Sequence, residues 1–285
     1  MLDDMDGFIW MDGQLVDWRE AKIHVLTHTL HYGSGVFEGE RAYSGTIFKM
    51  AEHHKRLQAS AEMMGFKIPF TIDEMNAAAM SVLEANKLKD AYVRPVAWHG
   101  SEALSVSTHH NTVHLAFAAW AWGSYYSNNE SGLRLMWSQW VRPAPNMALV
   151  HAKANGQYIT GTLGMNKAAD LGFNDAVMLD YRGYVAECTS SNIFFVKNGK
   201  LFTPIADCSL RGITRQTILD IARANGIEAE EKHIMPEELL AADEVFITGT
   251  AAEVQAVGSL ADSTFEIGPV TKKLSALYKE LVNKG

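Results

Sequence analysis

The sequence predicts an α+β fold of two domains. Three observations support this prediction. First, strand and helix patterns follow one another without a regular βαβ alternation. Second, a polar, turn-rich segment lies near the middle of the chain. Third, a chain of 285 residues with 47% hydrophobic side chains can form two cores. We expect a small N-terminal domain over residues 1–122, a linker over 123–132 and a larger C-terminal domain over 133–285.

The N-terminal domain is predicted from turn residues, caps and hydrophobic spacing. In chain order we expect hairpins turning at Asp12-Gly13 and Ser44-Gly45, a helix over 51–65 that ends at Gly65, a second helix, and strands over 91–98 and 111–122. The second helix has a clear start, because Thr71 and Glu74 have the spacing of a capping box.

The C-terminal domain is predicted in the same way. In chain order we expect a strand over 133–140, a helix over 158–171, hairpins over 176–187 and 192–204, a helix over 214–226, a strand over 244–249 that runs into a tight turn, and a last helix. Leu274, Tyr278 and Leu281 lie on one stripe of that last helix. A cleft between two such domains is a usual place for a ligand.

Charge and composition exclude several classes of partner. The net charge is −8 and no basic block occurs, so nucleic acid is not expected as a partner. No apolar run approaches the length of about 18 residues that a membrane helix needs. Cys188 and Cys208 form no CxxC pair, which indicates a reducing environment. We therefore expect a soluble, cytoplasmic protein.

One cluster of histidines suggests a metal site. His24, His28 and His31 have the spacing that places three imidazoles on one face of a helix. The β-branched residues between them favour a strand or an irregular path instead. We therefore favour structural histidines and expect no metal, and a metal-dependent hydrolase remains the alternative from another class. The nearby Gly33, Gly35 and Gly39 do not form a dinucleotide loop and are expected to permit a tight turn or a close backbone approach.

The chemistry centres on Lys153, whose neighbours Ala152 and Ala154 provide no bulk and no carboxylate. Two further features can bind an anion: the helix start after Gly212, and the small-residue turn over 248–253. By strand alternation Glu187 shares one side with Val185, and a carboxylate entering an apolar region needs a positive partner. Tyr92 and Arg94 face the same way on their strand and suggest either carboxylate capture or a structural ion pair.

Together these features match what pyridoxal phosphate needs: an amine for its aldehyde, an anion cup, and a carboxylate for its ring nitrogen. The chain resembles the fold-type IV pyridoxal-phosphate enzymes, and within them the branched-chain amino acid aminotransferases. The segments that carry this resemblance are, in chain order, HTLHYGSGVFEGERAY, HKRL, AYVRP, AKANGQY, VAECTSSNIFF, GITR and TGTAAEV. They extend over nearly the whole chain.

The resemblance implies a cofactor site. Lys153 is then the Schiff-base lysine, Tyr158 hydrogen-bonds the phenolic oxygen of the ring, and Glu187 binds the pyridine nitrogen. Arg56 binds the phosphate, and the phosphate cup is completed by Ile213, Thr214 and Thr250.

The resemblance also implies a substrate site in the cleft between the domains. Tyr92, with the amides of Thr250 and Ala251, would hold the α-carboxylate, and Arg94 would receive the distal carboxylate of glutamate. The side-chain pocket would be formed by Tyr32, Phe37, Trp122, Tyr125 and Tyr158. The implied reaction transfers the amino group of leucine, isoleucine or valine to 2-oxoglutarate in a ping-pong sequence. Enzymes of this fold are usually at least homodimers.

One segment leaves the substrate open. The serine-rich stretch from Cys188 to Asn192 is nearer to that of D-amino acid aminotransferases of the same fold. A D-amino acid or (R)-amine transaminase, or an enzyme similar to aminodeoxychorismate lyase, is therefore the alternative. The Tyr92-x-Arg94 pair and the GTAA turn are closer to the L-branched-chain pattern.

Overall fold

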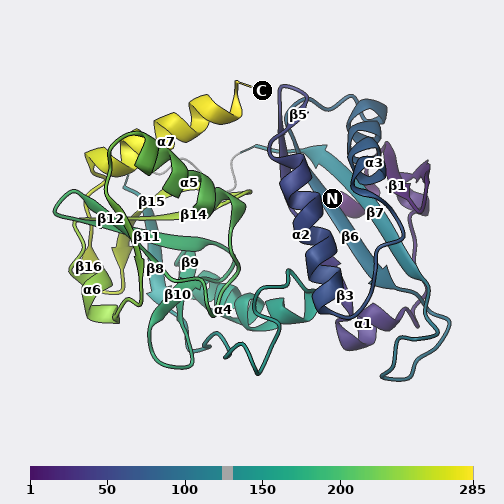
Figure 1. Ribbon diagram of the computed structural model, residues 1–285, viewed down its shortest axis with the longest axis horizontal. Helices are drawn as coiled ribbons and strands as arrows, with labels where there is room; N and C mark the ends of the chain where they lie inside the picture. Colours follow the sequence, from purple (N-terminus) through teal and green to yellow (C-terminus); the bar gives the residue numbers. More distant parts are fainter. Residues whose placement is uncertain (124–130, 285) are drawn as a thin grey trace. The chain divides into compact units, whose positions relative to one another are not determined.

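The computed structural model describes residues 1–123 and 131–284 and divides the chain into two compact units (Figure 1). The first unit is Met1–Gly123 with Ala152–Gly156, and the second is Ser124–His151 with Gln157–Lys284. Most of the predicted linker lies outside the described residues. Lys153 groups with the first unit, whereas the sequence placed it in the C-terminal domain, because its backbone pairs with a strand of the first unit.

The first unit is a seven-stranded sheet with helices. Its elements are η1 (Leu2–Asp4), β1 (Phe8–Met11), β2 (Gln14–Asp17), η2 (Trp18–Glu20), α1 (His28–Tyr32), β3 (Gly35–Phe37), β4 (Glu40–Tyr43), β5 (Thr46–Ile47), α2 (Met50–Met63), α3 (Ile72–Ala85), β6 (Ala91–His99) and β7 (Val113–Ala121). The strand order is β2-β1-β7-β6-β4-β5, with β3 also paired to β6, and every pairing is antiparallel. Both predicted hairpins are present.

The core of this unit lies between the sheet and the helices α2 and α3. Leu57 and Met75 of the helices are fully buried in one cluster with Val93 and Phe117 of the sheet. The predicted capping box of α3 is present, because Thr71 Oγ1 accepts the backbone N–H of Glu74. This packing fixes α2, whose residues recur in the site below.

The prediction for the histidine segment was correct for one half and wrong for the other. Residues 24–27 follow an irregular path, as expected, whereas His28–Tyr32 form the short helix α1. α1 ends at Gly33, which has the left-handed φ of 64° and donates its backbone N–H to the carbonyl of Thr29. A Cβ at Gly33 would lie 3.0 Å from the Cα of Gly156, so this close backbone contact needs a glycine. The helix thus depends on a tertiary contact that local propensity does not reveal.

The second unit is a nine-stranded sheet with helices. Its elements are β8 (Leu133–Trp137), α4 (Ile159–Asp170), β9 (Asp175–Leu179), β10 (Val185–Cys188), β11 (Asn192–Lys197), β12 (Lys200–Pro204), α5 (Ile213–Ala224), β13 (Ala229–Lys232), α6 (Pro236–Leu240), β14 (Glu244–Gly249), β15 (Glu253–Leu260), β16 (Ser263–Thr264) and α7 (Pro269–Val282). The short helix η3 (Asn155–Tyr158) precedes α4. The strand order is β10-β9-β8-β15-β14-β11-β12-β13, with β16 on β15.

Mixed pairing distinguishes this sheet from the first. β8 runs parallel to both β9 and β15, and β12 runs parallel to β13, while the predicted hairpins β9–β10 and β11–β12 are antiparallel. A register shift between Val185 and Glu187 interrupts the simple alternation expected on β10.

Both cysteines are free and buried. None of the helices in the described residues is long and apolar enough to span a membrane.

Candidate functional site

Lys153 is held in the first unit by its backbone. Its N–H donates to Ser60 Oγ on α2 at 3.0 Å, and its carbonyl accepts the N–H of Phe37 at 3.0 Å. Ala154 forms an isolated bridge with Val36, and Ala152 and Ala154 are buried in the core of this unit. The small neighbours noted in the sequence are therefore required by packing, and they fix the lysine backbone next to β3.

The side chain of Lys153 lies beside aromatic and cationic groups. Its Nζ is 4.8 Å from the ring centroid of Phe37, and the guanidinium of Arg94 lies 4.8 Å from the same ring. Arg94 Nη2 donates to Tyr92 Oη at 3.0 Å, and the ring of Tyr92 packs 5.0 Å from that of Trp122. The structure thus brings together five of the residues predicted for the site, all within the first unit.

Gly39 leaves room for the Tyr92 hydroxyl in this cluster. A Cβ at this position would lie 2.0 Å from Tyr92 Oη. The sequence analysis expected a tight turn or a close backbone approach at this glycine, whereas the approaching group is the side chain of Tyr92, which is predicted to bind substrate.

Arg56 is anchored by a buried carboxylate that the sequence analysis missed. Its Nε and Nη2 donate to the two oxygens of Glu38 at 2.6 and 2.8 Å. His53 Nδ1 lies 2.7 Å from Glu38 Oε2, and the Glu38 side chain has no exposed surface. Burial alone would raise the pKa of Glu38, but the charges of Arg56 and His53 outweigh burial and hold that pKa well below its usual range. A bidentate pair of this kind orients the guanidinium rigidly.

Glu187 in the second unit has the positive partner that its burial requires. The carboxylate is 5% exposed, and Arg142 Nη2 lies 2.9 Å from its Oε1. Asn192 Nδ2 donates to Glu187 Oε2 at 3.3 Å and to the carbonyl of Leu210 at 3.1 Å. A buried carboxylate paired with an arginine is consistent with the role predicted for Glu187, which is to bind a protonated nitrogen.

Asn192 also links Glu187 to the start of α5. A Cβ on Gly212, the N-cap of α5, would lie 2.0 Å from Asn192 Oδ1. Gly212 provides no side chain to cap the helix, so the first backbone N–H groups of α5, from Ile213 and Thr214, face outward along the axis. Such a helix start binds anions.

The turn between β14 and β15 lies beside this helix start. Thr248 pairs with Asn192 across the sheet, and a Cβ on Gly249 would be 3.7 Å from the Cβ of Ser191. Thr248 Oγ1 is buried and has no hydrogen-bond partner among the described residues. The half-buried Thr250 and Ala251 follow it. The second unit therefore gathers Glu187, the uncapped helix start and the predicted carboxylate turn around Asn192.

The three remaining predicted tyrosines differ in exposure and in whether the structure describes them. Tyr158 is half-buried at the junction of η3 and α4. Tyr32 is 48% exposed on α1, where its ring packs 4.7 Å from that of His28. Tyr125 lies outside the described residues.

The alternative histidine metal site is not assembled. His28 uses its two ring nitrogens on Ser34 Oγ at 2.6 Å and on the carbonyl of Ser105 at 2.8 Å. His31 Nε2 is bonded to the carbonyl of Val25, and His24 Nδ1 accepts the N–H of Leu26. The three imidazoles are thus bonded to groups of the protein that lie near them.

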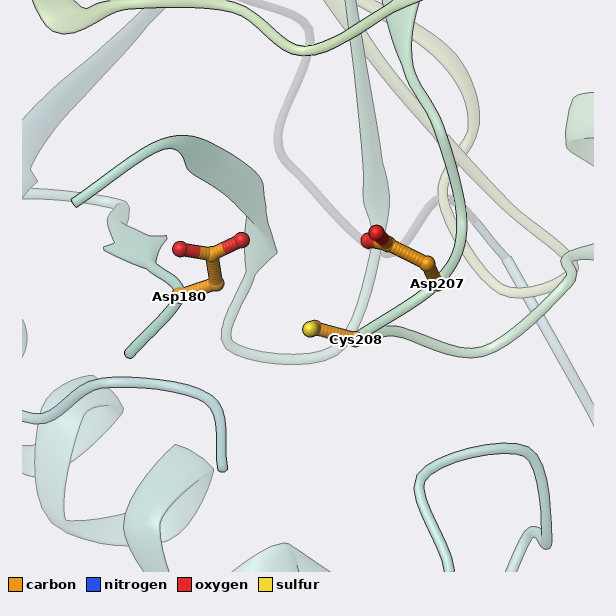
Figure 2. A group of neighbouring side chains, drawn as sticks. All are labelled: Asp180, Asp207 and Cys208. Carbon is orange, nitrogen blue, oxygen red and sulfur yellow. The ribbon is translucent and has the colours of Figure 1, made fainter. Parts of the chain in front are cut away.

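A different group has the proximity of metal ligands. Within the part of the chain that the structure describes, only Asp180, Asp207 and Cys208 lie close enough to share an ion, and Figure 2 shows the three side chains converging. Arg182 Nη2 already contacts Asp180 Oδ2 at 2.6 Å and Asp207 Oδ2 at 2.8 Å. Burial raises the pKa of the Cys208 thiol to about 11, so it is protonated at neutral pH. This group is an ion-pair network around a guanidinium.

Comparisons with known proteins identify the family of this chain. Residues 35–260 match the family described as Amino-transferase class IV. The chain is 44% identical to the branched-chain-amino-acid aminotransferase of Pseudomonas aeruginosa, over 98% of this chain and 94% of that protein. The chain belongs to the class IV aminotransferases, and it has the α+β fold-type IV architecture of that family.

Two solved structures are similar over the whole chain. The branched-chain amino acid aminotransferase of T.th. with pyridoxamine 5'-phosphate has a TM-score of 0.95 and 38% identity, covering 98% of this chain and 95% of that one. The same enzyme complexed with N-(5'-phosphopyridoxyl)-L-glutamate has a TM-score of 0.93 with the same identity and coverage.

Several residues of the site could not be found from the sequence. Glu38, Ser60, Arg142 and Asn192 each position a predicted site residue; the first three are distant in sequence from the residue they contact, and Asn192 lies five positions after Glu187. The only local signal was the buried-strand context of Glu187, which indicated that a cation was needed but not which one.

Proposed function

We propose that this chain is a pyridoxal-phosphate-dependent transaminase that moves the amino group of L-leucine, L-isoleucine or L-valine to 2-oxoglutarate. The observation that carries this proposal is the backbone-clamped Lys153, whose amine lies beside Phe37 and in one cluster with Arg94, Tyr92 and Trp122. Membership of the family and the names and ligands of the related proteins support it.

The residues present fit the cofactor. We assign the phosphate to Arg56 and to the uncapped start of α5, with the amides of Ile213 and Thr214 and the side chain of Thr250. The buried, unpartnered hydroxyl of Thr248 supports a polar ligand near this turn, because an unpartnered buried hydroxyl costs about 1–3 kcal/mol. Glu187 is assigned to the ring nitrogen and Tyr158 to the phenolic oxygen.

When bound, the cofactor withdraws electrons from the substrate Cα as that carbon loses its proton. The ε-amine of Lys153 removes this proton as a base and returns a proton as an acid. Glu187, paired with Arg142, would hold the ring nitrogen in its protonated form. The chain repeats these steps in reverse with 2-oxoglutarate, which makes the kinetics ping-pong.

Arg94 explains how one pocket can accept both an apolar and an acidic side chain. Its Nη2 is satisfied by Tyr92 and its plane packs on Phe37, so an apolar substrate leaves it partnered. Its buried Nε has no hydrogen-bond partner among the described residues, and this donor is available to a carboxylate. The remaining pocket residues are assigned to Tyr32, Phe37, Trp122, Tyr125 and Tyr158, and the α-carboxylate to Tyr92, Thr250 and Ala251.

The decisive experiment replaces the lysine. We expect Lys153→Ala to abolish transamination of L-leucine and to lose the covalent label that borohydride leaves on the wild-type chain with pyridoxal phosphate. Lys167→Ala, an exposed lysine on α4, is the matched control and should behave as wild type. Turnover of L-leucine by Lys153→Ala at the wild-type rate would refute the proposal.

A panel of amino donors tests the substrate. We expect L-leucine, L-isoleucine and L-valine to be faster than D-alanine and (R)-phenylethylamine. The names of the related proteins favour the L-branched-chain substrates. A clear preference for D-alanine would assign the chain to the alternative suggested by its serine-rich segment.

We also infer a homodimer or a higher homo-oligomer in the cytoplasm. α1 and the segments around it expose large apolar side chains, a feature typical of interfaces. These side chains are Val25, Leu26, Leu30, Leu104 and Val106, with exposed fractions of 71%, 43%, 61%, 41% and 79%. Light scattering at micromolar concentration tests this inference, and Leu30→Asp should shift the mass toward the monomer.

A further inference from the structure

The backbone of Lys153 is held on both sides by the first unit. The N–H donates to Ser60 Oγ at 3.0 Å, and the carbonyl accepts from the N–H of Phe37 at 3.0 Å. The second contact is an ordinary strand-like backbone bond that any residue at position 37 other than proline could make. The first depends on one side chain, because only a residue with a short acceptor at position 60 can make it.

Ser60 is placed for this task. It lies on α2, and its residue has no exposed surface. A hydroxyl inside a helix usually bonds to a carbonyl of its own preceding turn, as Ser81 does with Ala78 at 2.8 Å on α3. The Ser60 hydroxyl instead accepts from a residue far along the chain. Burying a hydroxyl without a partner costs stability, so this long-range bond explains why a polar residue is found at the position.

We propose that Ser60 is a positioning residue for Lys153, and that α2 aligns the lysine with the phosphate-binding arginine. This proposal rests on the function proposed above. Arg56 lies four positions before Ser60 on the same helix, so the two side chains share one face. Arg56 is itself held by two bonds to Glu38. Because Ser60 and Arg56 lie on the same face of α2, this helix sets the position of the Lys153 backbone relative to the Arg56 guanidinium.

We expect the loss of the Ser60 hydrogen bond to displace the amine of Lys153. Without the Ser60 acceptor, the backbone at Lys153 loses one anchor and retains the bond from Phe37 and the bridge at Ala154. The Nζ would then depart from its place 4.8 Å from the Phe37 ring centroid. Misplacement of a reacting group lowers the rate of the chemical step more than it weakens substrate binding.

The test compares Ser60→Ala with Ser81→Ala, which removes a helical hydroxyl from α3 in the same unit. We expect Ser60→Ala to lower kcat about 10-fold with KM for L-leucine changed less than about twofold, as for the loss of one hydrogen bond expressed in the transition state. Hydrogen exchange of the Lys153 amide should accelerate about 10-fold in the cofactor-free chain. Ser81→Ala should leave all three quantities near wild type.

Two further variants keep the test decisive. Ser60→Thr retains a hydroxyl and should restore the slow exchange at Lys153, while Ser60→Cys, with a weak sulfur acceptor, should resemble Ser60→Ala. If Ser60→Ala does not fold, amide exchange and kcat are compared between Ser60→Thr and Ser60→Cys instead. Equal amide exchange at Lys153 in wild type and in Ser60→Ala, or equal kcat, would overturn the positioning role. A wild-type chain that shows neither a borohydride label nor transamination would instead refute the proposed function, while the exchange result would still be valid.

Discussion

Individual side chains in this protein are fixed by partners that lie far away in the sequence. Glu38 neutralises Arg56, Arg142 neutralises Glu187, and Glu40 neutralises the buried His54. A buried charge without its partner is strongly unfavourable, so the loss of one member affects both. Predictions at the residue scale follow from these pairs.

The Glu38 carboxylate determines the orientation of Arg56. We expect Glu38→Gln to weaken binding of pyridoxal phosphate at least about 10-fold and to lower the free energy of unfolding by about 3 kcal/mol, since a buried charge loses its partner. Fluorescence titration and urea denaturation measure the two effects. Glu62→Gln changes an exposed carboxylate on the same helix and is the control. Wild-type affinity in Glu38→Gln would show that Arg56 needs no anchor.

The buried pair of His54 and Glu40 predicts a dependence of stability on pH. Burial alone would lower the pKa of His54, but the Glu40 carboxylate, whose Oε1 lies 3.1 Å from His54 Nε2, outweighs burial and raises it. A raised folded-state pKa contributes stability that is full below the unfolded pKa of about 6.5 and is lost as pH rises through the folded value. We therefore expect Glu40→Gln to reduce the loss of stability between pH 6 and pH 9.

Urea denaturation at several pH values measures this effect. His109→Gln removes an exposed histidine and should leave the pH profile of the wild type unchanged. A Glu40→Gln profile parallel to that of the wild type would contradict the linkage.

At the scale of elements, short segments place the site residues by packing closely against one another. The start of α5 approaches β11 so closely that Gly212 leaves no room for a Cβ beside Asn192. The same asparagine bonds to Glu187, so the helix start and the carboxylate share one support.

A methyl group at Gly212 should separate these elements. We expect Gly212→Ala to lower the free energy of unfolding by about 1–3 kcal/mol through overpacking, and to weaken binding of pyridoxal phosphate. Gly123→Ala, where a Cβ would meet no atom within 4 Å, is the control. If Gly212→Ala binds the cofactor as tightly as wild type, the close contact has no role in the site.

The elements themselves were largely predictable, because their signals are local. The hairpins follow from turn residues such as Asp12 and Asn198, both of which adopt positive φ. α3 follows from its capping box. The helix α1 could not be predicted, since its end depends on the contact between Gly33 and Gly156.

At the scale of the whole molecule, binding of the cofactor should stabilise the folded chain. A ligand that binds only the native state at 100 times its Kd adds about 2.7 kcal/mol to the free energy of unfolding. We expect pyridoxal phosphate to raise the melting temperature of the wild type, and to raise that of Lys153→Ala less, because the covalent attachment is lost. Pyridoxal without its phosphate is the matched ligand control. Identical melting curves with and without pyridoxal phosphate would contradict the assignment of the site.

The sequence by itself determined the α+β class and the order of most strands and helices, and it predicted Lys153, Arg56 and Glu187 as residues of the site. These properties are carried by local spacing, by caps and turns, and by ordered motifs in one chain. The tertiary structure alone decided that Lys153 belongs with the first unit, that Glu38 holds Arg56, and that Arg142 and Asn192 hold Glu187. Buried charges and backbone groups take whichever partner the fold brings within hydrogen-bond reach, and that choice leaves no local trace in the sequence.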